Sequence, residues 1–333
     1  MPAAPPFCVQ LIPAADLPAW LDDPALMAAI EFGGRTLQVQ GDPRRLMVGL
    51  PRLQGPALVE VWHSREPVSQ GFDGEIGFAA NDEVLFGQIL VDEQAFAGME
   101  EATAHAYDAV LGFLHRHAYP HILRIWNYFP QINESAGELD RYQAFCVGRA
   151  RGIGDDQRAN WDVPAATAIG TRSPGLLVYF LAAAEPGTQI ENPRQVSAYR
   201  YPQQYGPQTP SFSRATLKRW DGSHHLYISG TASIVGHASQ HPGDSRGQLH
   251  EILTNLRALL GTAASQHGLQ CDAPQRMSLL KLYLRHGEDA PAVADALREA
   301  LGQTPPYLLL QGEVCRPDLV MEIEGLYAEG CPG

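Results

Sequence analysis

Cysteine and long apolar runs are scarce in this sequence. The 333-residue chain has five cysteines, Cys8, Cys146, Cys271, Cys315 and Cys331, an odd number without CxxC spacing. Such a set indicates neither a disulfide framework nor a zinc site, and a reducing compartment is expected. No apolar run approaches the length of a membrane span. The N-terminus has neither the basic n-region nor the apolar h-region of a secretion signal. We therefore expect a cytoplasmic protein that does not enter a membrane.

Positive charge is also in short supply. The chain carries 24 Lys and Arg against 37 Asp and Glu, a net charge of −13, which argues against nucleic acid or an anionic membrane as partner. Neither a G-x-S-x-G elbow nor the Gly-Lys-Ser/Thr end of a phosphate-binding loop occurs. His115 and His117, two apart on an expected helix, face different ways and make a poor metal site.

The apolar pattern describes two passages with the same order of elements. In the first we expect strands at 84–91, 122–129 and 176–183, with helices at 99–117 and 138–149 between them. In the second we expect strands at 226–229, 279–285 and 307–311, with helices at 246–260 and 291–301 between them, followed by a tail strand. This order predicts two α+β halves with sheets backed by helices. Residues 185–213 between them form too long a connection for a plain linker, which favours a functional loop.

The tail strand carries two acids within an apolar pattern. Alternation places Met321 and Ile323 on one face, and Val320, Glu322 and Glu324 on the other. One acid is therefore drawn toward partly buried surroundings, where its pKa would rise and suit it to donate a proton near neutral pH. An edge strand with two solvated glutamates is the alternative.

Five arginines lie in apolar or aromatic company. They are Arg124, Arg141, Arg149, Arg151 and Arg214. In so acidic a chain they indicate bidentate recognition of a carboxylate, because the guanidinium fork matches the carboxylate plane. The alternative is ion pairing with some of the 37 acids, which explains most arginines in most proteins.

Several long motifs in matching order carry a family resemblance. They are RIWNYFPQIN at 124–133, RYQAFCVGR at 141–149, PAATAIG at 164–170, ISGTASIVG at 228–236, HPGD at 241–244 and GEVCRPDLVMEIEG at 312–325. From about residue 55 to the end, the chain resembles the chorismatase family. The length and the Cys315 tail resemble most the branch that makes 3-hydroxybenzoate, including xanthomonad enzymes that also yield 4-hydroxybenzoate. The first 50 or so residues match nothing comparable.

The resemblance implies a fold and a substrate. It implies an α+β fold of two YjgF-like (chorismate-mutase-like) units with mixed sheets backed by helices. Residues 1–185 would form the first unit with an N-terminal extension, and residues 186–333 the second unit, which carries the active site. Chorismate would be the small-molecule partner of a monomer or small homo-oligomer, without a metal or organic cofactor.

The resemblance also implies roles for single residues. The family's acid falls on Glu322, with Glu324 as its neighbour, and Cys315 matches the hydroxybenzoate-forming branch. As an alternative, Cys315 is only a small buried apolar residue. The substrate-holding positions fall on Tyr142, Arg149, Tyr201 and Arg214. Because Tyr201 lies in a variable loop, Tyr199 or Tyr205 could take its place.

The chemistry follows from chorismate, which has two carboxylates, an enolpyruvyl ether and a ring hydroxyl. Protonation of the enol ether methylene by Glu322 would give an oxocarbenium ion that collapses with loss of pyruvate. Attack by water would give a dihydroxycyclohexadiene carboxylate, whereas attack by the substrate's own hydroxyl would lead to a hydroxybenzoate. A hydrolytic chorismatase and an aromatic-acid-binding protein without turnover are the alternatives.

Overall fold

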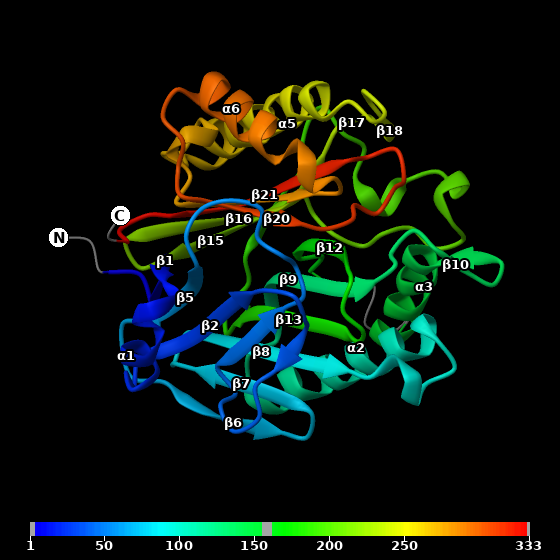
Figure 1. Cartoon of the computed structure of the whole chain (residues 1–333). Helices are drawn as coiled ribbons and strands as arrows, with labels where there is room; N and C mark the ends of the chain where they lie inside the picture. Colours follow the sequence, from blue (N-terminus) through cyan, green and yellow to red (C-terminus); the bar gives the residue numbers. More distant parts are fainter. Residues whose placement is uncertain (1–3, 155–161, 332–333) are drawn as a thin grey trace.

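The computed structural model describes residues 4–154 and 162–331 of the protein (Figure 1). Three larger sheets organise the chain. The N-terminal sheet has the order β1-β5-β2-β4-β3 and each of the other two has six strands. The N-terminal sheet consists of β1 (Phe7–Pro13), β2 (Leu26–Phe32), β3 (Leu37–Gln38), β4 (Arg45–Val48) and β5 (Leu58–Ser64), with the short helix α1 (Leu17–Leu21).

The two six-stranded sheets have the same topology. The first, in the order β12-β9-β13-β8-β7-β6, contains β6 (Ser69–Asp73), β7 (Ile76–Ala80), β8 (Val84–Val91), β9 (His121–Pro130), β12 (Ala165–Thr171) and β13 (Leu176–Ala183). The second, in the order β20-β19-β21-β16-β15-β14, contains β14 (Thr188–Ile190), β15 (Ala215–Trp220), β16 (Ser223–Ala232), β19 (Leu279–Leu284), β20 (Tyr307–Gln311) and β21 (Met321–Ala328). In each sheet one outer pair is parallel, β12 with β9 and β20 with β19.

Helices make the long connections in both units. They are α2 (Met99–His117) and α3 (Arg141–Ile153) in the first unit, and α5 (Ser245–His267) and α6 (Ala290–Leu301) in the second. A parallel pair needs a crossover, and α3 and α6 supply it. Asp140 and Gln143 form a capping box at the start of α3, and Asp244 caps α5. No helix in the two described ranges is long and apolar enough to cross a membrane.

Each six-stranded sheet has a helix-covered face and an inner face. The helices α2 and α3 pack on one face of the first sheet, and α5 and α6 on one face of the second (Figure 1). The inner faces of both sheets and the N-terminal sheet share one apolar core, which includes Trp62, Trp126 and Tyr283. Residues of β21 that point away from α5 and α6 therefore point into the middle of the molecule.

The structure confirms the α+β class, the sheets backed by helices and the repeated order of elements. The first sheet ends at Ala183 and the second begins at Thr188, and a division at residue 185 stays a prediction. The N-terminal sheet and the strands β6, β7, β12, β14 and β15 were not expected. Two short hairpins were not expected either, namely β10 (Ser135–Ala136) with β11 (Leu139–Asp140), and β17 (Ile234–Val235) with β18 (Ala238–Ser239).

The expectation of no disulfide is wrong for one pair of cysteines. Cys8 on β1 and Cys331, just after β21, are joined by a disulfide with their Cα atoms 5.5 Å apart. Their separation of 323 residues hides the pair from any spacing rule, because only the fold brings the two strands together. Cys146, Cys271 and Cys315 are free. The reducing compartment inferred from cysteine spacing stays a prediction.

Candidate active site

A cavity of about 420 Å³ is lined by α3, the loop that follows β14, the strand β16 and the loop before β21. A smaller cavity of about 40 Å³ shares five lining residues with it. The shared residues are Tyr142, Phe212, Gly230, Cys315 and Glu322. Tyr201 and Arg214 line the larger cavity and Arg149 the smaller one, so all six predicted site residues meet here.

Glu322 lies at the junction of the two cavities. Its strand β21 is central in the sheet, where Glu322 pairs with Ala232 of β16 and Tyr283 of β19. The Glu322 side chain is only 5% exposed, so the alternative of an edge strand with solvated acids is wrong. A register shift in β16 places Gly230 against this carboxyl group, and a Cβ atom there would lie 1.8 Å from Glu322 Oε1. The glycine therefore makes the room that the acid occupies.

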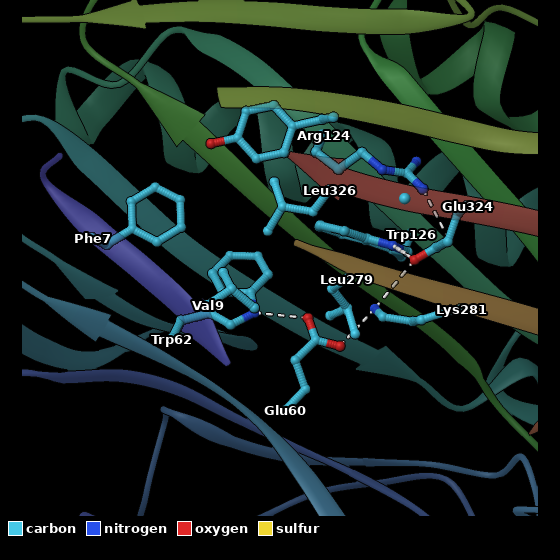
Figure 2. Close-up of a pocket in the computed structure, with 12 residues that line it drawn as sticks. Phe7, Val9, Glu60, Trp62, Arg124, Trp126, Leu279, Lys281, Glu324 and Leu326 are labelled. Atoms are coloured by element: carbon cyan, nitrogen blue, oxygen red, sulfur yellow. Dashed lines mark hydrogen bonds and ion pairs between the residues drawn. The ribbon is translucent and has the colours of Figure 1, made fainter. Parts of the chain in front are cut away.

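Glu324 is also buried, but its carboxylate is fully occupied by partners. It accepts hydrogen bonds from Trp126 Nε1 at 2.7 Å and from Thr167 Oγ1 at 2.6 Å. Arg124 Nη2 lies 2.9 Å from one of its oxygens, and Lys281 Nζ lies 3.2 Å from the other (Figure 2). Burial was expected for one acid of the tail strand, whereas the structure buries both.

The surroundings separate the pKa values of these two acids. Burial raises the pKa of Glu322 to about 8, and the nearby charge of Glu324 adds to the rise, against the opposing effects of Arg124 and Arg214. Burial also acts on Glu324, but Lys281 and Arg124 outweigh it and lower the pKa of this carboxyl. Glu322 is therefore protonated at neutral pH beside an ionised Glu324, the pattern of an acid and its electrostatic neighbour.

The arginines divide into paired and available groups. Arg124 pairs with Glu324, Arg141 with Glu93 and Arg151 with Glu100, so for these three the ion-pair alternative holds. Within the described ranges Arg149 and Arg214 form no ion pair, although they are only 4% exposed. Arg214 is close enough to Glu191 to oppose the rise that burial causes in the pKa of that acid, but the two side chains form no ion pair. Two buried guanidinium groups outside any ion pair of the described chain make this part of the molecule suited to a dianion.

Arg214 is held by one of its nitrogen atoms. Its Nη2 donates to the carbonyl oxygen of Val196 and to Tyr201 Oη, both at 2.8 Å. Its Nε is buried and has no hydrogen-bond partner among the described residues. The Arg149 guanidinium lies over the ring of Phe145 at 5.4 Å, one turn earlier on α3.

Cys315 lines both cavities next to Glu322. Burial, and secondarily the charge of Glu322, raise the pKa of the Cys315 thiol to about 12. The sulfur is therefore a neutral S–H group rather than a thiolate nucleophile at neutral pH. Tyr142 faces it from α3, and burial holds the pKa of this phenol well above its usual range.

The connection after β14 supplies much of the cavity wall, as expected for a functional loop. It contributes Tyr201, Gln204, Tyr205, Gln208, Pro210 and Phe212. Tyr201 and Tyr205 both line the cavity, whereas Tyr199 does not and is 38% exposed. Of the two proposed substitutes for Tyr201, only Tyr205 is in position.

Arg316 is a lining residue that the sequence reasoning missed. Its guanidinium lies 3.9 Å from the centre of the Tyr205 ring and donates to the carbonyl oxygen of His237 at 2.9 Å. It forms no ion pair in the part of the chain that the structure describes. Its position directly after Cys315 in the tail motif was the available signal.

Among residues 4–154 and 162–331, no three His, Cys, Asp or Glu side chains gather in a way that could hold a metal ion. Besides Asp140 and Asp318 in the wall of the larger cavity, the two cavities offer a neutral carboxylic acid, a neutral thiol, phenols and guanidinium groups. Such a set can bind a small dianion and deliver a proton to it.

Comparisons with known proteins find relatives of this chain along most of its length. Residues 60–182 match a family model described as the N-terminal part of FkbO/Hyg5-like chorismatases. A chorismatase from Streptomyces hygroscopicus is 36% identical over 313 residues, which is 92% of this chain and 90% of that protein. A 3-hydroxybenzoate synthase from Streptomyces hygroscopicus is 36% identical over 271 residues, 79% of this chain and 76% of that one. A crystal structure of a chorismatase superimposes with a TM-score of 0.86 and 33% identity, covering 98% of this chain and 99% of that chain.

Proposed function

Because the chain belongs to the chorismatase family, we propose that it converts chorismate to 3-hydroxybenzoate and pyruvate, with 4-hydroxybenzoate as a second product. The proposed catalytic acid is Glu322. The proposed substrate-holding residues are Tyr142, Arg149, Tyr201 and Arg214. The observation that carries the proposal is a buried carboxyl group that lines both cavities, with a buried arginine outside any ion pair of the described residues in the wall of each.

The unequal sizes of the two cavities suggest how chorismate lies. The three-carbon enolpyruvyl group suits the small cavity, where its carboxylate would meet Arg149. The ring and its carboxylate would fill the larger cavity and meet Arg214, whose buried Nε has a free hydrogen to donate. This orientation places the enol ether at the junction, beside Glu322.

The reaction then needs one proton and no external electrons. Glu322 transfers its proton to the enol ether methylene, and the remaining charge is an oxocarbenium ion on the ether carbon. The substrate's neighbouring hydroxyl oxygen attacks the ring carbon as the ether bond breaks, and pyruvate leaves with the bonding electrons. Loss of the hydroxyl proton, which restores the acid form of Glu322, leaves the oxygen bridging two ring carbons. The original bond between this oxygen and its own ring carbon then breaks, that carbon loses its hydrogen as a proton, and the oxygen takes up a proton. The ring is now aromatic, so chorismate becomes one hydroxybenzoate and one pyruvate without added water.

Cys315 supports the choice of the aromatic product. Its neutral thiol lies at the same junction and can hold the ring hydroxyl or exclude water from the ether carbon. Water in that place would divert the reaction to the dihydroxycyclohexadiene carboxylate.

The test is incubation of the purified protein with chorismate, with pyruvate measured enzymatically and the aromatic products separated by chromatography. We expect equal amounts of pyruvate and hydroxybenzoate. Pyruvate accompanied by the dihydroxy acid would identify a hydrolytic chorismatase. Binding of chorismate without pyruvate release would identify a binding protein and contradict the proposal.

A further inference from the structure

A network of four charged side chains extends from the N-terminal sheet to Glu324, the neighbour of the candidate acid Glu322. Lys281 Nζ lies 2.8 Å from Glu60 Oε2 and 3.2 Å from Glu324 Oε1, and Glu324 Oε2 is 2.9 Å from Arg124 Nη2 (Figure 2). Each of these side chains is at least 96% buried. They come from β5, β19, β21 and β9, so this network of side chains links all three sheets.

The four groups balance in charge and are fixed in place. Two carboxylates oppose two cations, and Trp62 Nε1 donates to Glu60 Oε1 at 2.8 Å while Trp126 Nε1 donates to Glu324 Oε1 at 2.7 Å. Burial of such a group of ions is costly unless every charge is matched, and removal of one member leaves an uncompensated charge. Glu324, which lies between Lys281 and Arg124 in this network, is two residues from Glu322 on the same face of β21.

We propose that Glu60 is a positioning residue for the acid Glu322, acting through Lys281 and Glu324. The proposal rests on the proposed function of Glu322. It gives the N-terminal sheet a part in the reaction, although this sheet lines neither of the two cavities. Glu60 fixes Lys281, Lys281 and Arg124 fix Glu324 as an ionised group, and Glu324 keeps the neighbouring acid in its protonated form.

The groups that face Glu322 come from every element around it. They are Glu324 on its own strand, Tyr283 on β19, Arg124 on β9, Tyr142, Cys146 and Arg149 on α3, and Cys315 and Arg214 on the adjoining loops. The charged residues Asp140, Arg316 and Asp318 also line the larger cavity. The thiols and phenols are neutral near pH 8, because burial raises their pKa values. The charges that act most strongly on Glu322 are those of Glu324, Arg124 and Arg214.

The direction of the effect can be worked out from the charges. In Glu60→Gln the buried network has two cations and one anion, and the excess positive charge favours ionised Glu322. The pKa of Glu322 falls from about 8, so the acid form is lost at lower pH. The double variant Glu60→Gln with Lys281→Met has one anion and one cation, and its charge balance is that of the wild type. In this variant the charge of Arg124 and the hydrogen bonds from Thr167 and Trp126 still favour ionised Glu324.

The experiment measures the pH dependence of kcat/KM for pyruvate release in the wild type and both variants. We expect the high-pH fall of kcat/KM to begin about one pH unit lower in Glu60→Gln, and at the wild-type pH in the double variant. If Glu60 has only a packing role, the pH of the high-pH fall does not change, and kcat/KM of the double variant is no higher than that of Glu60→Gln. Either result would overturn the proposal. Glu31→Gln is the matched control, because it removes an acid of the same sheet that pairs with Arg45.

A second measurement separates this proposal from the proposed function. The Glu322 carboxyl is titrated by carbon-13 NMR of glutamate-labelled protein, with its signal assigned by its loss in Glu322→Gln. A lower Glu322 pKa in Glu60→Gln, restored in the double variant, supports the positioning role even if chorismate is not turned over. An unchanged Glu322 pKa in Glu60→Gln overturns it, even if the wild type releases pyruvate.

Discussion

Glu322 and Glu324 have the same functional group, yet their contacts give them opposite protonation at neutral pH. Glu324 has four close partners, two of them cations, whereas burial and the charge of Glu324 raise the pKa of Glu322 to about 8. In Glu322→Gln we expect pyruvate release to fall by about 10²–10⁴-fold, because the proton donor is lost. Chorismate affinity, measured by calorimetry, should change little. Turnover within tenfold of the wild type would move the acid role to another residue.

Arg149 and Arg214 should each contribute to the affinity for chorismate. Replacement of either by Lys is expected to weaken binding by about 2–5 kcal/mol, because an ammonium group cannot reproduce the planar fork. Titration calorimetry measures the change. Arg141→Lys is the control, since Arg141 lies on the same helix as Arg149 but pairs with Glu93. Normal binding by both site variants would show that these arginines are structural.

Cys315 should affect the product more than the rate. Removal of the neutral thiol in Cys315→Ala opens space at the junction, where water can replace the substrate's own hydroxyl as the attacking group. We expect the dihydroxy acid to increase at the expense of 3-hydroxybenzoate in chromatograms, with a smaller loss of chorismate consumption than in Glu322→Gln. The control is Cys271→Ala, which changes a buried cysteine away from both cavities. A wild-type product mixture would leave Cys315 a packing role only.

Helices and strands whose apolar residues follow a regular spacing were predicted from the sequence. Helical spacing placed a helix at 99–117, the bounds of α2, and the apolar run at 176–183 is the strand β13. Two strands of the N-terminal sheet give no alternating signal, because β2 is buried almost throughout and β3 has only two residues. The partners of Glu324 were missed for a different reason: Arg124 lies 200 residues away, and no periodicity relates residues so distant.

The irregularity in β16 makes room for the acid on β21. In Gly230→Ala the added Cβ atom cannot occupy its position 1.8 Å from Glu322 Oε1, so the carboxyl group must move. We expect kcat to fall by at least about tenfold, because a displaced donor no longer meets the methylene. The melting temperature is the accompanying measurement. Gly261→Ala on α5 has open space around it and should leave kcat unchanged. Equal kcat values in the two variants would contradict the close packing described here.

For the whole molecule, the Cys8–Cys331 disulfide joins the first strand of the N-terminal sheet to the end of β21. Because it closes a very long loop, we expect Cys8→Ser to lower the free energy of unfolding by about 2–4 kcal/mol. Urea unfolding with and without a reducing agent measures this. Reduction should destabilise the wild type to the same extent and leave the variant unchanged. Equal stability of wild type and variant under non-reducing conditions would show that the bridge adds nothing.

The central claim is that the reaction begins with proton transfer from Glu322 to the enol ether methylene. The most direct measurement is turnover of chorismate in heavy water, with pyruvate reduced to lactate as it forms and its methyl group analysed by mass spectrometry. An exchangeable Glu322 carboxyl delivers one deuteron, so we predict singly deuterated product. The rate of pyruvate release should fall as the pH rises through about 8, because Glu322 loses its proton there. Pyruvate without deuterium would show that its hydrogen comes from the substrate, and would contradict the account.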